Sequence, residues 1–331
     1  MAALHSYSQV KLVDGADKSP VAYASVFNAD GSLAGVTGAD GLLPAKAGAK
    51  GALTVQHINY ETKTFSPDTV SGGMVMLVPY THKVAEVAVS AGKLEYLKMK
   101  AYVRRYHIGD SQPASFFEGI CDFYLPIDGG KARVKLCSGR NLMRKDLKER
   151  YKSYFVFGNG LFPWRTESLL ESFEKRGLLD KGNLRNAVSE GKRGLKYKVK
   201  VDAKSHTCEL ASDSLFSTKA FNFNFFGFKF RIENMGFGEL YDTSAGYPSA
   251  KNLMRKNLYL DCAWRVDGKN NPEIHDEYFE EYYVLSMGYA SKDAAKKASK
   301  DKTVEQFVRP DGIPPLAAPL AKAVEAMVPW K

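Results

Sequence analysis

The strongest constraint on the fold lies between Gln9 and Ala91, where short apolar runs alternate with turn signals at close intervals. The run from Val21 to Phe27 is followed by Asp30-Gly31, and the run from Leu33 to Thr37 is followed by Asp40-Gly41. Asp hydrogen-bonds the nearby backbone and Gly accepts a positive φ, so both dipeptides suit tight turns. Strands this short with turns this frequent predict an all-β sandwich. Further strands are expected at Val10–Val13, Leu53–Ile58, Met74–Val78 and, as the last of the sandwich, Val84–Val89.

This segment resembles the carboxypeptidase-regulatory-like domain. The resemblance is carried by four stretches, Pro20–Val26, Gly35–Gly41, Leu53–Tyr60 and Val84–Val89. It implies a seven-stranded sandwich of the immunoglobulin-like and transthyretin-like type, abundant in the envelope of bacteria of the Bacteroidetes type. It implies no peptidase activity, because the family is an accessory sandwich. The location that follows is the periplasm or the outer membrane, with the signal peptide already removed, since residues 1–5 have neither a basic segment nor an apolar core.

After residue 92 the sequence changes to longer predicted strands that are rich in Tyr and Phe. They predict a large antiparallel sheet or half-barrel with few helices. Its strands are expected at Tyr96–Tyr106, Ser115–Tyr124, Lys131–Cys137 after a hairpin turn at residues 128–130, Lys196–Asp202, Ala220–Glu233, Leu258–Val266 and Glu277–Met287.

Two helices are expected in this part, one after an N-cap at Thr166 and ending before Gly177, and one from Lys292 to about Lys300. The Pro-rich tail should lie along the sheet in extended form and end in a short helix from Leu316 to Met327. We therefore divide the chain into a sandwich (1–92), a β-rich domain with an inserted helix (93–305) and a tail (306–331).

Charge and apolar content exclude some classes of function. The formal charge is +10, but the lysines are dispersed, and the densest runs, Lys192–Lys200 and Lys292–Lys302, are interpreted as the solvated faces of a strand and a helix. The alternative is a nucleic-acid-binding protein, which would carry its basic residues on a single face and lose affinity for DNA or RNA as the salt concentration rises. We expect no nucleic-acid partner. No apolar run is long enough to cross a bilayer, so no transmembrane segment is expected.

The sequence predicts no catalytic residue, no metal site and no cofactor. Its four cysteines, at 121, 137, 208 and 262, form no CxxC pair, and we interpret them as free, mostly buried thiols. The acidic run of Asp276, Glu277, Glu280 and Glu281 is interpreted as solvated charge. The aromatic run Phe221–Phe230 is interpreted as a strand that packs in the core, with a bulge near Gly227 that keeps its Phe side chains on one face. The alternative is that these side chains line an apolar ligand pocket.

Cations beside aromatic rings mark a candidate interaction surface, because they can hold an anion or a sugar ring. The residues are Arg104, Arg105, Tyr106, Trp164 and Arg165. We expect a non-enzymatic envelope protein for binding or scaffolding, in which the sandwich positions a β-rich domain that binds a lipid, glycan or protein partner. The alternative is a hydrolase whose site is assembled only by the fold, with His107 or His275 and a carboxylate in a cleft.

Overall fold

The chain is mainly β, which confirms the predicted class. The computed structural model describes residues 10–43, 51–80, 85–88, 94–127, 131–146, 187–190, 196–213, 222–225, 227–244, 246, 248, 250–266 and 273–330. The predicted hairpin turn at 128–130 and the helix after Thr166 lie outside these residues.

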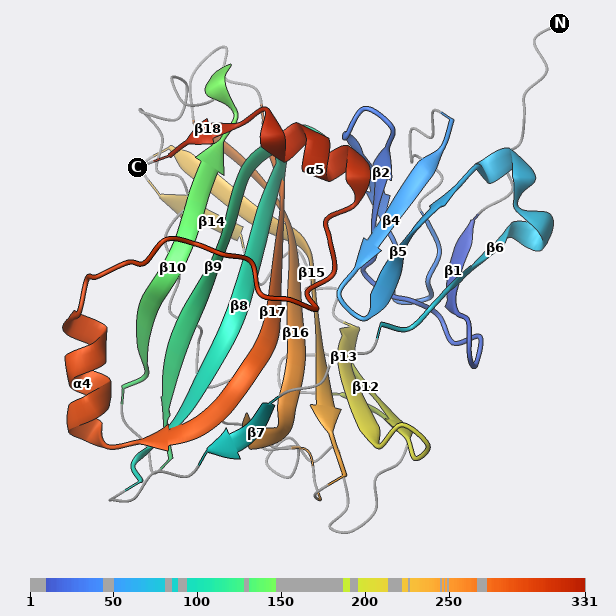
Figure 1. Cartoon of the computed structure of the whole chain (residues 1–331). Coiled ribbons are helices and arrows are strands. Elements are labelled where there is room, and N and C mark those ends of the chain that lie inside the picture. The colour runs from blue at the N-terminus through green and yellow to red at the C-terminus, as the bar shows by residue number, and fades with distance from the viewer. Residues whose placement is uncertain are drawn as a thin grey trace, which may run out of the picture.

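Six short strands near the N-terminus form two small sheets (Figure 1). The antiparallel sheet has the order β3-β2-β4-β5, and β1 pairs in parallel with β6. The bounds are β1 Lys11–Asp14, β2 Ser25–Asn28, β3 Leu33–Val36, β4 Leu53–His57, β5 Tyr60–Phe65 and β6 Met74–Leu77, with short 3-10 turns at Pro67–Thr69 and Ser71–Gly73. Apolar side chains from both sheets, among them Leu12, Val26, Leu53 and Leu77, form one buried cluster.

The predicted last strand of the sandwich departs from expectation. β7 (Ala85–Ala88) pairs in parallel with β17 (Ile274–Ala290), which belongs to the large sheet. The strand was predicted correctly from its apolar alternation, but alternation does not name the partner. β7 is thus part of the large sheet, and it precedes all the other strands of that sheet in the sequence.

Twelve strands make the large sheet, which is twisted and strongly curved (Figure 1). The order is β11-β12-β13-β15-β16-β17-β8-β9-β10-β18, with β14 on β15 and β7 on β17. The remaining bounds are β8 Tyr96–Gly109, β9 Gln112–Pro126, β10 Arg133–Met143, β11 Ala187–Glu190, β12 Lys196–Asp202, β13 Thr207–Asp213, β14 Asn222–Phe225, β15 Phe228–Asp242, β16 Leu253–Val266 and β18 Val328–Pro329, with a 3-10 turn at Ala250–Asn252. β17 lies between β16 and β8, so a late strand joins the two halves of the sheet.

The aromatic run forms a tight hairpin, not the bulged strand expected from Gly227. Phe223 pairs with Phe230 and Phe225 with Phe228 across β14 and β15. Gly227 lies in the turn with φ +79°, a conformation that glycine adopts without strain. The alternation of Phe and Asn predicts strand equally well on either side of such a turn, which explains the error.

A segment that we call the C-terminal strap, residues 301–317, runs in extended form over one face of the large sheet (Figure 1). It begins after α4 (Lys292–Lys300) and leads into α5 (Ala318–Glu325), so the helix predicted from Lys292 and the short helix predicted in the tail are both present. The strap donates from Glu305 N to the Cys137 carbonyl, 2.8 Å, on β10. These observations confirm the predicted extended tail.

A shared core joins the N-terminal strands, the large sheet and α5. Phe27 and Tyr23 supply it from the N-terminal part, Tyr106 and Phe279 from the large sheet, and Leu320 from α5. The Tyr106 and Phe279 rings stack with centroids 4.6 Å apart. The domain boundaries at 92 and 305 stay a prediction. None of the described helices is long and apolar enough to cross a membrane.

Candidate functional site

A cavity of about 340 Å³ lies between the N-terminal strands and the β12–β16 side of the large sheet. Its walls come from segments far apart in the sequence: the β1–β2 connection, the β4–β5 hairpin, and strands β12, β13, β15 and β16. The lining residues are Asp17, Ser19, Pro20, Val21, Ala22, Tyr23, Ala39, His57, Tyr60, Val199, Lys200, Glu209, Ala211, Phe237, Gly238 and Asn257. Most of this surface is apolar, with a few polar groups that converge at one end.

Tyr23 sets the distance between the two parts. It has φ +58°, an uncommon value for a residue with a side chain, so the surrounding contacts must hold it there. Its ring lies directly against the backbone of β15, because a Cβ added to Gly236 would be 2.5 Å from the ring. The ring also contacts Tyr259, with centroids 6.1 Å apart. The absence of a side chain at Gly236 therefore permits the close approach that forms one wall.

Lys200 supplies a fixed cation at the polar end. Its Nζ is 2.6 Å from Asp17 Oδ2, 2.8 Å from Ser19 Oγ and 3.6 Å from Asp14 Oδ2. Burial disfavours the charge, but the hydrogen bond that Lys200 donates to Asp17 and the nearby carboxylates outweigh it and raise the pKa of Lys200. Lys200 belongs to the run interpreted as a solvated strand face, and its pairing with the β1–β2 connection corrects that interpretation at this position.

Glu209 is the cross-strand partner of Lys200 on β13 and accepts a hydrogen bond from Asn59 Nδ2 at 3.2 Å. Burial raises the pKa of this carboxyl, although Lys200 acts in the opposite direction. The polar end therefore contains one cation, Lys200, beside the carboxyl groups of Asp14, Asp17 and Glu209.

His57 is a neutral wall residue. Burial, reinforced by the Arg255 guanidinium, lowers its pKa to about 3. Its Nδ1 accepts the Asn59 backbone N–H at 3.1 Å, and the ring also hydrogen-bonds the backbone of Ala22. A histidine held at both nitrogens positions the β4–β5 hairpin and contributes an aromatic face to the cavity.

Three residues of the predicted interaction surface lie inside the protein. Arg104, Arg105 and Tyr106 are all buried, with Arg104 only 1% exposed, so they form no surface for a partner. Antiparallel pairing explains the error, because β17 places Glu281 opposite Arg104 and Glu280 opposite Arg105. Trp164 and Arg165 lie outside the described residues.

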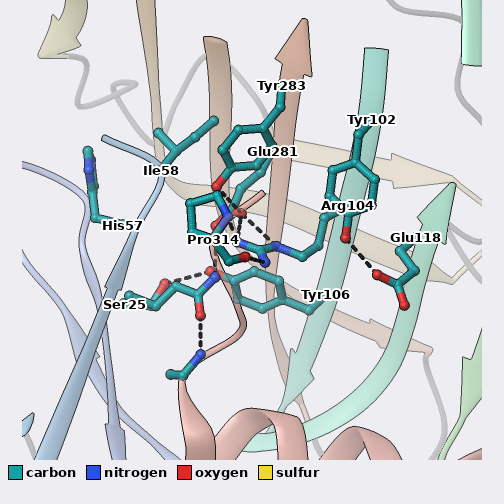
Figure 2. Close-up of polar contacts among 12 residues, drawn as sticks. Ser25, His57, Ile58, Tyr102, Arg104, Tyr106, Glu118, Glu281, Tyr283 and Pro314 are labelled. Carbon is teal, nitrogen blue, oxygen red and sulfur yellow. Dashed lines mark hydrogen bonds and ion pairs between the residues drawn. The ribbon is translucent and has the colours of Figure 1, made fainter. Parts of the chain in front are cut away.

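The same pairing overturns the interpretation of the acidic run as solvated charge. Asp276 and Glu281 are buried, and Glu280 lies 3.0 Å from Arg105. Arg104 donates to Glu281 Oε2 from Nε at 2.7 Å and also from Nη2 (Figure 2). Cations and carboxylates that looked like two separate surface features neutralise each other within the sheet.

Arg104 and Glu281 also fasten the strap. Arg104 Nη1 donates to the Pro314 carbonyl at 2.9 Å (Figure 2), and Gln56 on β4 accepts the Ala317 N–H at 2.6 Å. The Glu281 carboxylate outweighs the effect of burial and raises the pKa of Arg104. This set of residues, which we call the strap anchor, joins β4, β8, β17 and the strap.

His107 and Asp276 form a histidine–carboxylate pair of the kind that the hydrolase hypothesis requires. Its Nε2 is 2.8 Å from Asp276 Oδ1, and its ring stacks on Tyr278 with centroids 4.5 Å apart. Both members are buried, and neither lines the cavity. His275 is half exposed, near Glu233 and Glu273. The structure thus places both histidines away from the cavity.

Two half-buried carboxyl groups lie next to each other on paired strands. Asp261 and Glu277 are direct partners on β16 and β17. Burial, reinforced by Asp261, raises the pKa of Glu277 to about 8, and burial with the Glu233 charge raises that of Asp261 to about 6. Among the described residues, Glu277 Oε2 has no hydrogen-bond partner. Glu277 therefore retains a proton at neutral pH.

Replacing Glu277 with Gln is expected to stabilise the protein at pH 9 by about 2 kcal/mol. The full difference between the folded and unfolded pKa values of Glu277 would give a larger stabilisation, which we reduce because the carboxyl is only half buried. The unfolded carboxyl ionises near its ordinary pKa and the folded one near 8, so stability falls as pH rises between them. Urea unfolding at pH 5 and pH 9 measures the difference. E325Q, at an exposed carboxyl on α5, is the control, and equal gains from E277Q at both pH values would contradict the expectation.

Cys121, Cys208 and Cys262 are buried free thiols, and Cys137 is a half-buried one, as interpreted from the sequence. Burial raises the pKa of Cys121 to about 12. A thiol with so high a pKa carries little thiolate at neutral pH and is a poor nucleophile.

Comparison with known proteins gives little further guidance. No protein-family model and no curated protein matches the sequence. Among solved structures, lipovitellin, studied for its lipid–protein interactions, matches with a TM-score of 0.27 and 10% identity over 60% of this chain. The matched region spans 26% of the lipovitellin chain. Similarity at this level indicates neither a common fold nor a common ligand.

Proposed function

We propose that the protein is a non-enzymatic binding protein that holds a small amphipathic ligand in the cavity between its N-terminal strands and its large sheet. The observation that carries this function is the cavity itself. Its volume of about 340 Å³ falls in the range of small-molecule sites, which are mostly apolar with a few placed polar groups. Such sites form preferentially where two folded parts meet.

The chemistry of the walls favours a lipid-like or other amphipathic molecule over a glycan. Val21, Tyr23, Val199 and Phe237 offer apolar or aromatic surface. A glycan would need many hydrogen-bonding groups, whereas Lys200 is already engaged by Asp17 and Ser19. The polar end can accept one hydroxyl or amide of a ligand whose remainder is apolar.

The N-terminal strands have a positioning role in this function. They supply Tyr23 and His57 to the cavity and Gln56 to the strap anchor. An envelope location is part of the proposal and rests on the resemblance of residues 9–91 to the carboxypeptidase-regulatory-like domain. Fractionation of the source cells into cytoplasm, periplasm and membranes tests that part separately.

Native mass spectrometry of the protein purified from its own cells gives the first test. A retained lipid-sized molecule is the expected result. The second test is a titration with anilinonaphthalene sulfonate, a fluorescent amphipathic probe. Ala211→Trp places an indole in the cavity and is expected to weaken saturable probe binding at least about tenfold, which corresponds to about 1.4 kcal/mol.

Ala29→Trp is the matched control, because Ala29 is exposed in the β2–β3 turn and the same indole would lie outside the cavity. It should bind the probe like the unmodified protein. Equal probe affinity in both variants, with both folded by circular dichroism, would reject this cavity as the site. Absence of saturable binding to the unmodified protein would also reject it.

A further inference from the structure

A second, more open cavity of about 540 Å³ lies where the strap crosses β9 and β10. It is lined by Glu118, Gly139, Arg140, Phe307 and Arg309. It shares no lining residue with the cavity between the N-terminal strands and the large sheet. Two arginines from different segments meet here, one from β10 and one from the strap.

Glu118 is the centre on which they converge. It is fully buried and accepts a hydrogen bond from Tyr102 Oη at 2.6 Å. Arg140 contacts Oε1 from Nε at 2.7 Å and Nη2 at 2.6 Å. Arg309 contacts Oε2 from Nε at 3.2 Å and Nη2 at 2.9 Å. Each carboxylate oxygen is therefore held by the fork of one guanidinium, which fixes both arginines in place.

The charges at this site do not balance. Two guanidinium groups face one carboxylate, which leaves one positive charge uncompensated within the cavity. Burial works against ionisation of Glu118, but the Tyr102 hydroxyl and the two arginines outweigh it and hold the pKa of Glu118 below its usual range. Glu118 is thus ionised at neutral pH, and its charge cancels only one of the two cations.

Donors remain on both arginines. A guanidinium has five N–H donors, and these two side chains use only Nε and Nη2. Among the described residues, neither Nη1 group has a partner. Arg140 is 49% exposed and Arg309 is 35% exposed, and both side chains line the open cavity. Phe307, stacked on Tyr102 at 6.4 Å, forms a rigid aromatic wall.

We propose that this second cavity is a binding site for an oxyanion, a phosphate or carboxylate group of a ligand, held between Arg140 and Arg309. Guanidinium groups bind such groups through paired N–H donors, and here the cost of ordering two flexible side chains has already been met by Glu118. Because the site joins the strap to β10, an anion bound across both arginines also secures the strap.

Chemical modification of the intact protein provides the test. Phenylglyoxal reacts with accessible arginines, and peptide mass spectrometry gives the rate at each position. We expect inorganic phosphate to slow modification of Arg140 and Arg309 relative to sodium chloride of equal ionic strength. Arg144, a partly exposed arginine paired with Asp146, is the internal control and should react at the same rate in both salts.

Acetate at equal ionic strength then distinguishes the source of the anion. Protection by both anions supports a general oxyanion site, and protection by phosphate alone narrows it to phosphate-bearing ligands. Modification of Arg140 and Arg309 at equal rates in phosphate, acetate and chloride would overturn the proposal.

Variants give an independent measurement. In Arg140→Gln, phosphate affinity measured by the broadening of its ³¹P resonance is expected to fall about tenfold or more, whereas Arg144→Gln should leave it unchanged. Equal broadening in the two variants would contradict the site. Since neither experiment probes the other cavity, failure here leaves the proposed function intact, and the reverse also holds.

Discussion

Replacing Arg104 with Met is expected to lower the free energy of unfolding by about 3–5 kcal/mol, because Glu281 would keep its buried charge without its partner. The loss includes the bond from Arg104 Nη1 to the Pro314 carbonyl, so the strap would lose one of its anchors as well. Urea unfolding followed by tryptophan fluorescence and circular dichroism measures the change.

A matched control is available in Arg144→Gln, which breaks an ion pair that is largely exposed and should cost less than about 1 kcal/mol. The double variant Arg104→Met with Glu281→Met is expected to recover much of the loss, because it removes the unpaired charge and replaces it with apolar volume. A double variant no more stable than Arg104→Met alone would contradict this account of the strap anchor.

Replacing Leu320 with Ala is expected to cost about 3 kcal/mol, since this fully buried side chain of α5 lies in the core shared with the N-terminal strands and the large sheet. The unfolding transition should stay single and move as a whole, because one cluster supports all three parts. Thermal and urea unfolding, each with two spectroscopic probes, test both points.

Lys322→Ala is the control on the same helix, because Lys322 is exposed and its removal should change stability by less than about 0.5 kcal/mol. Two separated transitions in Leu320→Ala would show that α5 supports only one part of the molecule. A loss as small as that of Lys322→Ala would show that the shared core tolerates the cavity.

Local pattern was sufficient for most of the strands. The Tyr-rich stretch from Tyr96 to Tyr106 predicts β8, and the lysine-rich stretch from Lys292 predicts α4 with the observed bounds. Pattern failed where partner choice decided the structure. The strand at Ala85–Ala88 was predicted, but its pairing with β17 depends on contacts made about two hundred residues later in the chain.

The charged residues show the same limit more sharply. Arg104-Arg105 and Glu280-Glu281 were each interpreted as surface features, because a sequence shows charge but not burial. Only the register of β8 against β17 places them opposite one another. A run of cations and a run of anions, each on a predicted strand, was the available signal, and cross-strand pairing of opposite charges is the rule that connects them.

Neither cavity was predictable from a motif. The first is lined by Tyr23, His57, Lys200 and Phe237, which belong to four separate segments. The second needs Glu118 beneath Arg140 and Arg309, and the strap brings the last of these from far along the chain. Sites assembled in this way depend on the fold alone, so spacing in the sequence carries no trace of them.

The position of the strap has a consequence for how the protein is made. Residues 313–324 supply Ile313, Leu316, Leu320 and Val324 to cores that the N-terminal strands and the large sheet also need. During synthesis those surfaces emerge from the ribosome before the segment that covers them. The central pairing of β17 with β8 can form only after nearly three hundred residues of the chain have been made. We therefore expect the nascent chain to expose an apolar sheet face for seconds, the interval in which a chaperone can bind it, and to complete its fold only after the strap has emerged.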